Sequence, residues 1–367
     1  MTPIDPLRIG IIGAGRMGRI RARTARADPR CRVVYIVDAD AGRAADLAAE
    51  VGAEAGTDAD RLLARRDVDA VVVATPPKYL APLSRAAMQS GKHVFCEKPM
   101  ARTVAEAETV RAAASGGRGP RVVVGFTLRY HRAVRRAWSL VRAGAIGEPC
   151  YVRGRYGHGG RPGYGGEWRM NTDLSGGGEL LDQGVHLIDL GRCFLGEFED
   201  IAGFLERYFW QPPSGPGSLL SKPVEDNAFL LLRTREGRVA SLHASWTQWK
   251  NLFSFEVFGR DGFVSADGLG GSYGPERLTV GRRRPEGGPP ATEEIEMPAH
   301  DVGPAPDFPA GDVWSAEWSG FVSTVFGTGG DAIPPHDAGP AAATALDACR
   351  ALGVIEKIYG SGGSAQE

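Results

Sequence analysis

The sequence predicts an α/β fold in two parts: a parallel sheet with helices on both faces, then an α/β domain with an open, mainly antiparallel sheet. Three observations predict it. Short apolar runs alternate with helical segments over residues 1–126. A glycine-rich turn follows the first apolar run. From Asp200 onward, several strand-like runs follow one another without helices between them, which is typical of an antiparallel sheet.

In the first part, strands are predicted where apolar and β-branched residues run together, and helices where the apolar spacing is helical. The expected strands are residues 7–12, 32–37, 69–74, 93–96 and 121–126. The expected helices are residues 16–27, 41–51, 82–90 and 103–114. The last helix opens on a capping box of Thr103 and Glu106.

The second part mixes helices with a run of strands joined by turns. The expected helices are residues 133–143, 178–195, 314–326 and 338–359. The expected strands are residues 150–156, 200–205, 227–234, 238–247, 253–258 and 262–266. Residues 157–166 and 211–217 are rich in glycine or proline and are expected to be loops. The predicted domains are therefore residues 1–126 and 127–360, with residues 361–367 as a disordered tail.

Composition excludes several classes of function. The formal net charge of -1 gives no electrostatic reason to expect nucleic acid or an anionic membrane as a partner. The one basic run, residues 282–284, precedes a Pro/Gly-rich stretch and is expected to be a solvated loop. No secretory signal or membrane span is found. The five cysteines lack metal-ligand or redox spacing, so we expect no metal site and a cytoplasmic, reducing location.

A glycine motif follows the first predicted strand. The segment Gly-Ala-Gly-Arg-Met-Gly matches G-x-G-x-x-G between a strand and a helix, which is the context of a dinucleotide site. Gly13 allows the tight turn, Gly15 lets the backbone approach a pyrophosphate, and Gly18 permits close helix–strand packing. The helix N-terminus adds amide donors. The expected cofactor contacts here are Gly13, Gly15, Arg16, Met17 and Gly18.

An acidic residue ends the second predicted strand. Asp38 lies 20 residues after Gly18, where a carboxylate accepts hydrogen bonds from the adenosine ribose. Because an ionised Asp38 would repel a 2′-phosphate, NAD is favoured over NADP. Arg43 is a possible phosphate partner and leaves NADP open. The alternative is a tight turn followed by an exposed aspartate.

Two further segments follow predicted strands. Ala74-Thr75-Pro76 follows one strand and Glu97-Lys98-Pro99 the next, and ligands of open α/β sheets bind outside the carboxyl ends of strands. We expect Ala74, Thr75, Pro76, Glu97 and Lys98 to contact the cofactor. The ammonium of Lys98 could also stabilise a developing alkoxide and lower the pKa of a neighbouring base. Taken alone, Lys98 could equally be a surface lysine in a turn.

The segment 178–195 carries a carboxylate and an imidazole. Asp182 and His186 are four residues apart, so a regular helix would place them on one face. Histidine titrates near neutral pH and suits proton transfer to or from a hydroxyl. The alternative is a partly buried histidine whose hydrogen bonds are satisfied by its own helix.

These motifs occur together and in order. Their combination resembles the glucose–fructose oxidoreductase, inositol dehydrogenase and MocA-like (Gfo/Idh/MocA) family. The residues that carry the resemblance are 13–18, Asp38, Ala74-Thr75-Pro76, Glu97-Lys98-Pro99, Gly125-Phe126 and 176–189.

The resemblance implies roles for particular residues. Lys98 matches the family's catalytic-site lysine, and its bond to Pro99 would often be cis. His186 matches the usual acid/base and Asp182 the usual substrate-positioning carboxylate. Arg129 falls where members often present a basic side chain to the substrate. The expected activity is NAD(H)-dependent oxidation or reduction of a secondary alcohol.

The resemblance also implies a fold and an assembly. The fold would be a Rossmann domain followed by an α/β domain whose open sheet forms a homodimer or homotetramer. One departure is visible: members frequently have a histidine about four residues after the Thr-Pro pair, where this chain has Leu80. That departure puts one cofactor contact in doubt and not the reaction.

The segment 153–169 suggests the kind of substrate. It holds arginines and aromatic residues among glycines, and we expect Arg155, His158 and Trp168 to contact a sugar-like molecule. Sugars, nucleotide sugars, cyclitols and sugars of secondary metabolites such as aminoglycosides fit this pattern. Structural salt bridges would explain the same arginines. A cationic aminoglycoside would instead need carboxylates, and Glu167, Asp173 and Glu179 are nearby in sequence.

Two other functions stay open. One is a non-catalytic, sugar-sensing regulator on the same fold, against which the presence of Lys98, Asp182 and His186 argues. The other is an enzyme that retains NAD for internal redox cycling, as in epimerisation or glycoside cleavage.

Overall fold

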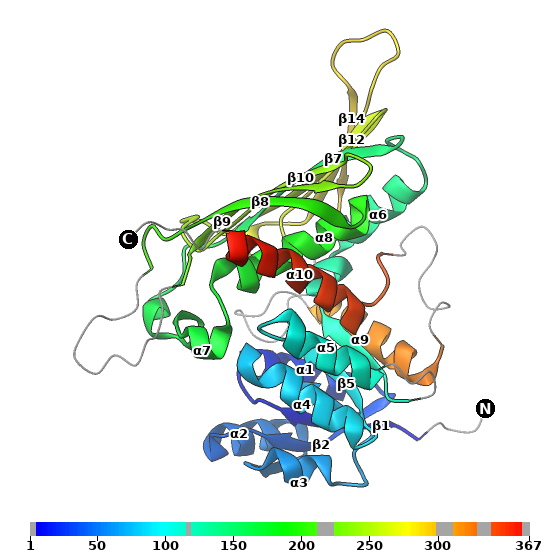
Figure 1. The fold of residues 1–367 in the computed structure, drawn as a ribbon. Helices are drawn as coiled ribbons and strands as arrows, with labels where there is room; N and C mark the ends of the chain where they lie inside the picture. The colour runs from blue at the N-terminus through cyan, green and yellow to red at the C-terminus, as the bar shows by residue number, and fades with distance from the viewer. Residues whose placement is uncertain (1–4, 115–118, 211–223, 299–310, 329–338, 362–367) are drawn as a thin grey trace. The chain divides into compact units, whose positions relative to one another are not determined.

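The computed structural model describes residues 5–114, 119–210, 224–298, 311–328 and 339–361. The chain forms two compact units (Figure 1). The first unit consists of Met1–Phe126, Trp314–Asp331 and Ala342–Cys349, and the second of Thr127–Val313, Ala332–Ala341 and Arg350–Glu367. The second unit therefore differs from the expected domain of residues 127–360, because parts of both closing helices belong to the first unit.

The first unit is built on a six-stranded parallel sheet in the order β3-β2-β1-β4-β5-β6. Its strands are β1 (Leu7–Ile12), β2 (Cys31–Val37), β3 (Glu54–Gly56), β4 (Ala70–Val73), β5 (His93–Glu97) and β6 (Val122–Gly125). The chain reverses its direction of travel across the sheet between β1 and β4. In sheets of this topology, ligands bind outside the carboxyl ends of the strands at that point.

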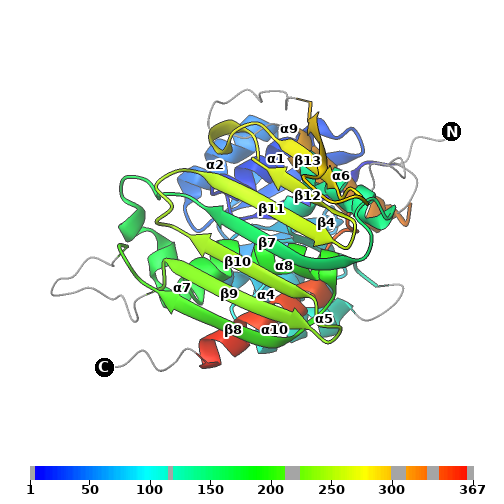
Figure 2. The ribbon, with the colours of Figure 1, turned by 90° about the horizontal axis from the view of Figure 1, so that it is seen from above.

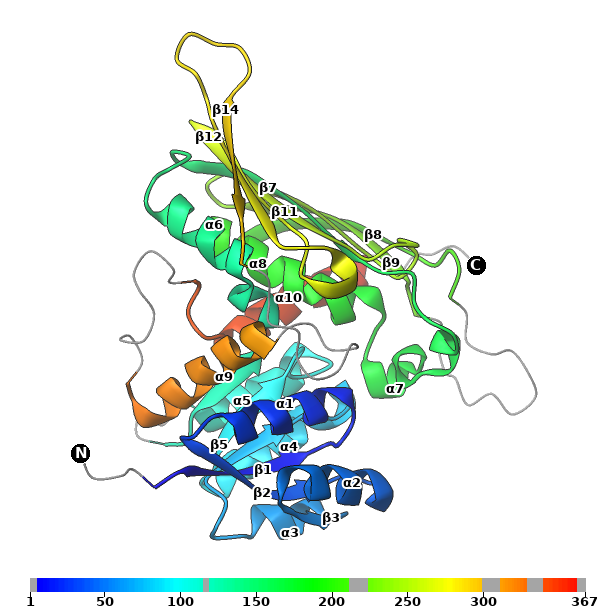
Figure 3. The same cartoon turned by 180° about the vertical axis from the view of Figure 1, so that it is seen from behind.

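Helices cover both faces of this sheet (Figure 3). They are α1 (Arg16–Ala27), α2 (Ala41–Val51), α3 (Ala59–Leu63), α4 (Pro77–Gln89), α5 (Val104–Ala114) and α9 (Gly311–Phe326). Buried residues of α1 and α2 share one core with Trp318 and Phe321 of α9, and the ring of Phe321 meets Phe95 edge-on at 5.6 Å. The late segment α9 is thus part of the core beneath β5.

The second unit is built on an eight-stranded sheet in the order β14-β13-β12-β11-β7-β10-β9-β8 (Figure 2). Its strands are β7 (Pro149–Gly157), β8 (Phe198–Glu206), β9 (Asn227–Thr234), β10 (Val239–Ser245), β11 (Leu252–Gly259), β12 (Gly262–Asp267), β13 (Arg277–Arg282) and β14 (Ala291–Glu296). All neighbours pair antiparallel except β7 and β10, which are parallel.

Helices of the second unit are α6 (Arg132–Arg142), α7 (Thr172–Ser175), α8 (Val185–Leu195) and most of α10 (Ala345–Ser361). A π-helical turn, Leu180–Gly184, leads directly into α8. Strand β9 alternates between buried Leu230 or Leu232 and exposed Phe229 or Leu231, so one face of the sheet is covered and the other is open. None of the described helices is long and apolar enough to cross a membrane.

The predicted fold class is confirmed, and the differences have local causes. Strands β3, β13 and β14 and helix α3 were not predicted; β3 has only three residues, and β14 has almost no buried side chain to give an alternating pattern. Arg282 ends β13 instead of lying in a loop. Helix α4 begins at Pro77, because proline is tolerated in a first turn. The expected loop 211–217 and tail residues 362–367 lie outside the described residues, while α10 reaches Ser361.

Candidate active site

The three motif glycines follow β1, and each has a different structural role. Gly13 has φ 102°, and a Cβ there would lie 2.5 Å from the carbonyl oxygen of Ala74. A Cβ on Gly18 would lie 1.7 Å from the carbonyl oxygen of Gly13. A Cβ on Gly15 would meet no atom within 4 Å, so the backbone is open there. Gly15 is also the N-cap residue of α1, and the N–H groups at a helix N-terminus can bind phosphate.

Asp38 follows β2 and faces this glycine turn. Its two carboxylate oxygens accept hydrogen bonds from the backbone N–H of Ala14 at 2.7 Å and of Asp40 at 2.9 Å. Each carboxylate oxygen has a second lone pair, so Asp38 can still accept from ribose hydroxyls. Arg43, the possible partner of a 2′-phosphate, forms an ion pair with Asp40 at 3.1 Å. This arrangement fits NAD better than NADP.

The ends of β4 and β5 carry the other expected cofactor contacts. Ala74 donates to the carbonyl of Ile12 at 2.8 Å, which holds the end of β4 beside the glycine turn. The buried hydroxyl oxygen of Thr75 has no hydrogen-bond partner among the described residues, so it is available to a ligand. Pro76 precedes the first residue of α4. Lys98 is half-buried, and its bond to Pro99 is cis, as the resemblance implies.

The side chain of Glu97 has a charged partner inside the first unit. Its carboxylate accepts a hydrogen bond from Nε of Arg21 at 2.7 Å, and Nη1 of Arg21 pairs with Glu317 at 2.7 Å. Arg21 is fully buried and lies over the ring of Phe95 at 4.3 Å. Burial alone would lower the pKa of Arg21, but Glu317 and Glu97 reverse this and raise it. The Glu97 side chain therefore holds the end of β5 in place, and the expected contact of Glu97 with the cofactor stays a prediction.

Arg21 was not singled out from the sequence, although a signal was present. The buried face of α1 includes Gly18, Arg21, Ala22 and Ala25, which are spaced three, one and three residues apart. An arginine on an otherwise apolar helix stripe predicts a buried acidic partner, because burying an unpaired charge is costly. Its partners could not be named, since both are distant in sequence.

In the second unit, three consecutive glycines precede the helical segment that carries Asp182 and His186. Gly176 ends α7 with φ 83°. A Cβ on Gly177 would lie 2.0 Å from the hydroxyl of Tyr359, and one on Gly178 2.1 Å from the carbonyl oxygen of Glu225. The left-handed backbone at Gly176 and the close packing at Gly177 and Gly178 therefore require glycine.

Glu225 caps this helix. Its carboxylate accepts from the backbone N–H of Gly178 and of Leu180, each at 3.1 Å, and from the hydroxyl of Tyr359 at 2.8 Å. Burial raises the pKa of Glu225, although these donors oppose the change. A negative group at a helix N-terminus is favourable. The cap fixes the segment that presents Asp182.

Asp182 lies in the π-helical turn and not in a regular α-helix. The expectation that Asp182 and His186 share a face assumed α-helical spacing, which the π turn changes. Such turns are frequent at functional sites. The sequence offers no clear signal for this turn.

An ion-pair chain holds Asp182. Nε of Arg169 donates to Asp182 at 2.9 Å, and Nη1 of Arg169 pairs with Glu167 at 3.1 Å. Arg161 pairs with Glu167 at 2.7 Å. The guanidinium of Arg169 also lies over the ring of Trp168 at 4.5 Å. Burial opposes the charge of Arg169, but Asp182 raises its pKa overall.

His186 is largely buried beside aromatic hydroxyl groups. Its ring meets Tyr156 edge-on at 6.2 Å, and Tyr156 meets Tyr273 at 5.8 Å. Burial raises the pKa of Tyr273 to about 12, against the opposing hydrogen bond with Gln183. Burial, followed by Tyr273 and Asp182, also raises the pKa of Tyr156 well above its usual value. Both hydroxyls therefore stay neutral at physiological pH.

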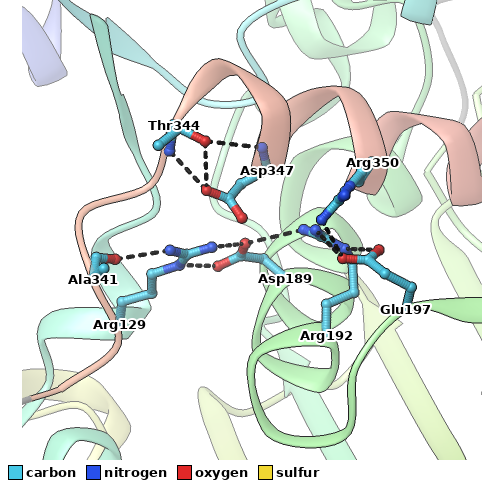
Figure 4. Close-up of polar contacts among 8 residues, drawn as sticks. All are labelled: Arg129, Asp189, Arg192, Glu197, Ala341, Thr344, Asp347 and Arg350. Atoms are coloured by element: carbon cyan, nitrogen blue, oxygen red, sulfur yellow. Dashed lines mark hydrogen bonds and ion pairs between the residues drawn. The ribbon is translucent and has the colours of Figure 1, made fainter.

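Two residues expected to contact the substrate have other surroundings in the structure, and their substrate contacts stay predictions. Arg129 is buried and donates to both oxygens of Asp189, at 2.7 and 2.5 Å, and to the carbonyl of Ala341 at 2.8 Å (Figure 4). It stabilises the second unit internally. Arg155 lies on the open face of β7, because alternation places it opposite Gly154, which packs on Leu187 of α8.

The remaining substrate candidates lie near Asp182. Trp168 stacks on Arg169, the partner of Asp182. His158 accepts from the backbone N–H of Gly160 at 2.8 Å and meets Tyr164 edge-on at 5.4 Å. Among the residues that the structure describes, no group of three or more His, Cys, Asp or Glu side chains could hold a metal ion.

Comparison with known proteins assigns the two units. Residues 7–126 match the "Oxidoreductase family, NAD-binding Rossmann fold", and residues 134–265 match the "GFO/IDH/MocA C-terminal domain". The inositol 2-dehydrogenase of Rubrobacter xylanophilus is 30% identical over 77% of this chain and 78% of that protein. The chain belongs to the Gfo/Idh/MocA oxidoreductase family. Its first unit contains the NAD-binding Rossmann domain.

Further relatives of this Gfo/Idh/MocA protein act on sugars. A dTDP-3,4-didehydro-2,6-dideoxy-alpha-D-glucose 3-reductase of Streptomyces violaceoruber is 30% identical over 81% of this chain and 82% of that protein. The structure of a levoglucosan dehydrogenase in complex with NADH and levoglucosan superposes with a TM-score of 0.82, at 25% identity over 99% of this chain and 98% of that chain.

The residues at the carboxyl end of the parallel sheet of this family member fit NAD. The open backbone at Gly15, the acceptor Asp38 and the hydroxyl of Thr75 are placed where a dinucleotide needs space, an acceptor and a donor. Position 80, where family members frequently have a histidine, is occupied by Leu80. This side chain is fully buried in α4, so it packs in the core and offers no polar contact to a cofactor.

Proposed function

We propose that this protein is an NAD(H)-dependent dehydrogenase or ketoreductase that acts on a secondary alcohol of a sugar, nucleotide sugar, aminoglycoside-type sugar or cyclitol. The cluster around His186 carries the proposal. In it, the largely buried imidazole of His186 lies against the ring of Tyr156. Burial, then Tyr273 and then the charge of Asp182 raise the pKa of the Tyr156 hydroxyl. A proton-transfer group beside neutral hydroxyls and a fixed carboxylate suits a hydroxylated substrate.

The proposed mechanism assigns a role to each of three residues. NAD, when bound, accepts or supplies the hydride. In the direction of oxidation, His186 takes the proton of the reacting hydroxyl, and the ammonium of Lys98 stabilises the negative charge that develops on that oxygen. Asp182 accepts a hydrogen bond from a second hydroxyl and orients the ring.

The charges near His186 favour a neutral substrate within this class. Asp182 and Glu167 are both paired with Arg169, and Glu167 is paired with Arg161 as well. Carboxylates already paired in this way attract a polycationic aminoglycoside weakly. We therefore place neutral sugars, glycosides and cyclitols ahead of aminoglycosides.

The test is a substrate panel followed by NADH absorbance, with inositols, sugars, glycosides, nucleotide sugars and aminoglycosides. We expect NADH formation with one class and NAD. His186→Asn should lower kcat by about 10²–10⁴-fold while NADH still binds, as titrated by its fluorescence. His243→Asn, on the open face of the same sheet, is the control and should keep its activity within about twofold.

Three results would contradict the proposal. Full activity of His186→Asn at every pH would remove His186 as the acid/base. Substrate conversion without net NADH, by protein that retains its cofactor through purification, would indicate internal redox cycling. Sugar binding without any conversion would indicate a sensor.

A further inference from the structure

Several large aromatic side chains are exposed at one end of the second unit's sheet. Tyr208 and Phe209 follow β8 and are 63% and 56% exposed, and Trp249 in the turn after β10 is 61% exposed. The rings of Phe209 and Trp249 meet edge-on at 4.9 Å. Exposed clusters of large apolar side chains mark binding surfaces more often than single exposed ones do.

The backbone that presents these rings is fixed by a buried carboxylate. Asp226 is fully buried and accepts from the backbone N–H of Tyr208 at 3.0 Å, of Phe209 at 2.8 Å and of Trp210 at 2.8 Å. Burying a carboxylate is costly unless it is well hydrogen-bonded. Three consecutive aromatic residues are thus held in one conformation, and a preorganised surface loses little entropy when it binds a ligand.

Trp249 has an uncommon conformation. Its φ is 55°, in the left-handed region that bulky residues rarely adopt. The close approach of Gly159, whose Cβ would lie 3.1 Å from Cα of Trp249, holds the turn in place. Such conformations cluster at functional sites.

A continuous row of rings joins this surface to the candidate active site. Tyr164 contacts Trp210 at 5.2 Å, Trp210 contacts Phe209 at 5.1 Å, and Phe209 contacts Trp249. Tyr164 is buried, and the guanidinium of Arg161 lies over its ring at 5.2 Å. Arg161 belongs to the ion-pair chain that holds Asp182. The row therefore runs from Asp182 to the surface.

Strand register places these groups at the same end of the sheet. Glu206 at the end of β8 pairs with Asn227, which pairs with Ser245 at the end of β10, and Ser245 pairs with Gly157 at the end of β7. Glu225, two residues before Asn227, caps the helix that carries Asp182. The exposed rings and the reacting end of the site are therefore neighbours within one unit.

We propose that Phe209 and Trp249 form a subsite for a second sugar ring, so that the substrate is a glycoside of at least two rings. This inference rests on the proposed function, because it places the first ring at His186. Three ring contacts, with centroid distances of 5.2, 5.1 and 4.9 Å, join Tyr164 to Trp249. The apolar face of a pyranose packs well on an aromatic ring. A sugar ring is favoured over a nucleotide because Arg161 and Arg169 are already ion-paired.

The experiment compares kcat/KM with NAD for cellobiose, maltose and lactose against the matching methyl glycosides. In Trp249→Ala and Phe209→Ala, the ratio of disaccharide to methyl glycoside should fall about threefold to tenfold. Trp249→Phe keeps a ring and should retain most of the ratio; it also serves if Trp249→Ala does not fold. Phe204→Ala on β8, where the ring is 74% exposed, is the control and should not change the ratio.

Each other outcome overturns a different statement. An unchanged ratio in both ring-deleting variants, with methyl glycosides still oxidised, would overturn the subsite and leave the proposed function intact. With dTDP-glucose added as a further probe, a loss confined to that probe would overturn the sugar-ring assignment in favour of a nucleobase. If the wild-type protein oxidises none of these glycosides but does oxidise a cyclitol or a nucleotide sugar, the subsite is overturned and the proposed function stays intact. If it oxidises no member of the whole substrate panel, both are overturned.

Discussion

Arg21 and Arg169 each bridge a pair of carboxylates, and the two arginines differ in their access to water. Arg21 in the first unit joins Glu97 and Glu317 with a side chain that is 0% exposed. Arg169 in the second unit joins Glu167 and Asp182 with a side chain that is 26% exposed. The same chemistry therefore occurs once in a closed core and once beside a candidate active site.

The difference in exposure changes what each bridge can do. In the first unit no water can replace a lost partner, so the arginine holds α1, β5 and α9 together and cannot exchange partners. In the second unit water reaches the ion pair, so the pair contributes little to stability. A partly exposed carboxylate can exchange part of its hydrogen bonding for a substrate hydroxyl. We infer that the first bridge serves stability and the second serves function.

The largest expected effect is on stability and concerns the buried ion pairs of Arg21. Arg21→Met removes the charge and leaves two carboxylates buried, so the free energy of unfolding should fall by about 3–5 kcal/mol. Urea unfolding followed by circular dichroism measures it. Arg23→Met on the same helix breaks a partly exposed pair with Glu50 and should cost under about 1 kcal/mol. Equal losses in the two variants would show that burial does not distinguish these pairs.

Loss of the partly exposed ion pairs of Arg169 should have the reverse effect, with a small change in stability and a large change in activity. Arg169→Met should lower the free energy of unfolding by under about 1 kcal/mol, because the pair is partly exposed. It should lower kcat/KM for the best substrate by about tenfold to a hundredfold, since Asp182 loses its fixed orientation. Arg161→Met, which touches only Glu167 in the ion-pair chain, is the matched control. If Arg169→Met unfolds the protein as Arg21→Met does, the contrast between the two bridges fails.

The smallest expected effect is on stability at alkaline pH and concerns the buried hydroxyl of Tyr273 in the second unit. Burial raises the pKa of Tyr273 to about 12, above the usual value of about 10, so the folded state favours the neutral hydroxyl. The stability from this group is complete below about pH 10 and is lost as the pH rises through about 12. Tyr273→Phe should reduce this alkaline loss by about 1–2 kcal/mol.

Urea unfolding of wild type and variant at about pH 9 and about pH 12 provides the measurement. Burial also raises the pKa of the Cys31 thiol to about 11 and that of Cys96 to about 12, in the first unit. These thiols titrate in the same window, so only the difference between variant and wild type reports Tyr273. An identical pH dependence in both proteins would show that Tyr273 is not held neutral by the fold.

The amino-acid sequence determined the local elements and the cofactor motif. Apolar runs such as β1 and β4 and the helical spacing of α1 and α2 depend on neighbours in sequence, and their predicted bounds agree closely with the structure. The motif glycines could be assigned in advance because each role is set by backbone geometry within one strand–turn–helix unit. The strand-rich second half followed from the absence of helices between its apolar runs.

The tertiary structure decided which charged side chains meet. Arg129 was expected at the substrate, but it is neutralised by Asp189, 60 residues away. Glu97 was expected at the cofactor, but it is held by Arg21, 76 residues away. Asp182 lies in a π-helical turn whose start is capped by Glu225. A residue's type shows which interactions it can make, but the energy of a charge depends on burial and on the nearest opposite charge, and both arise only when distant segments pack together.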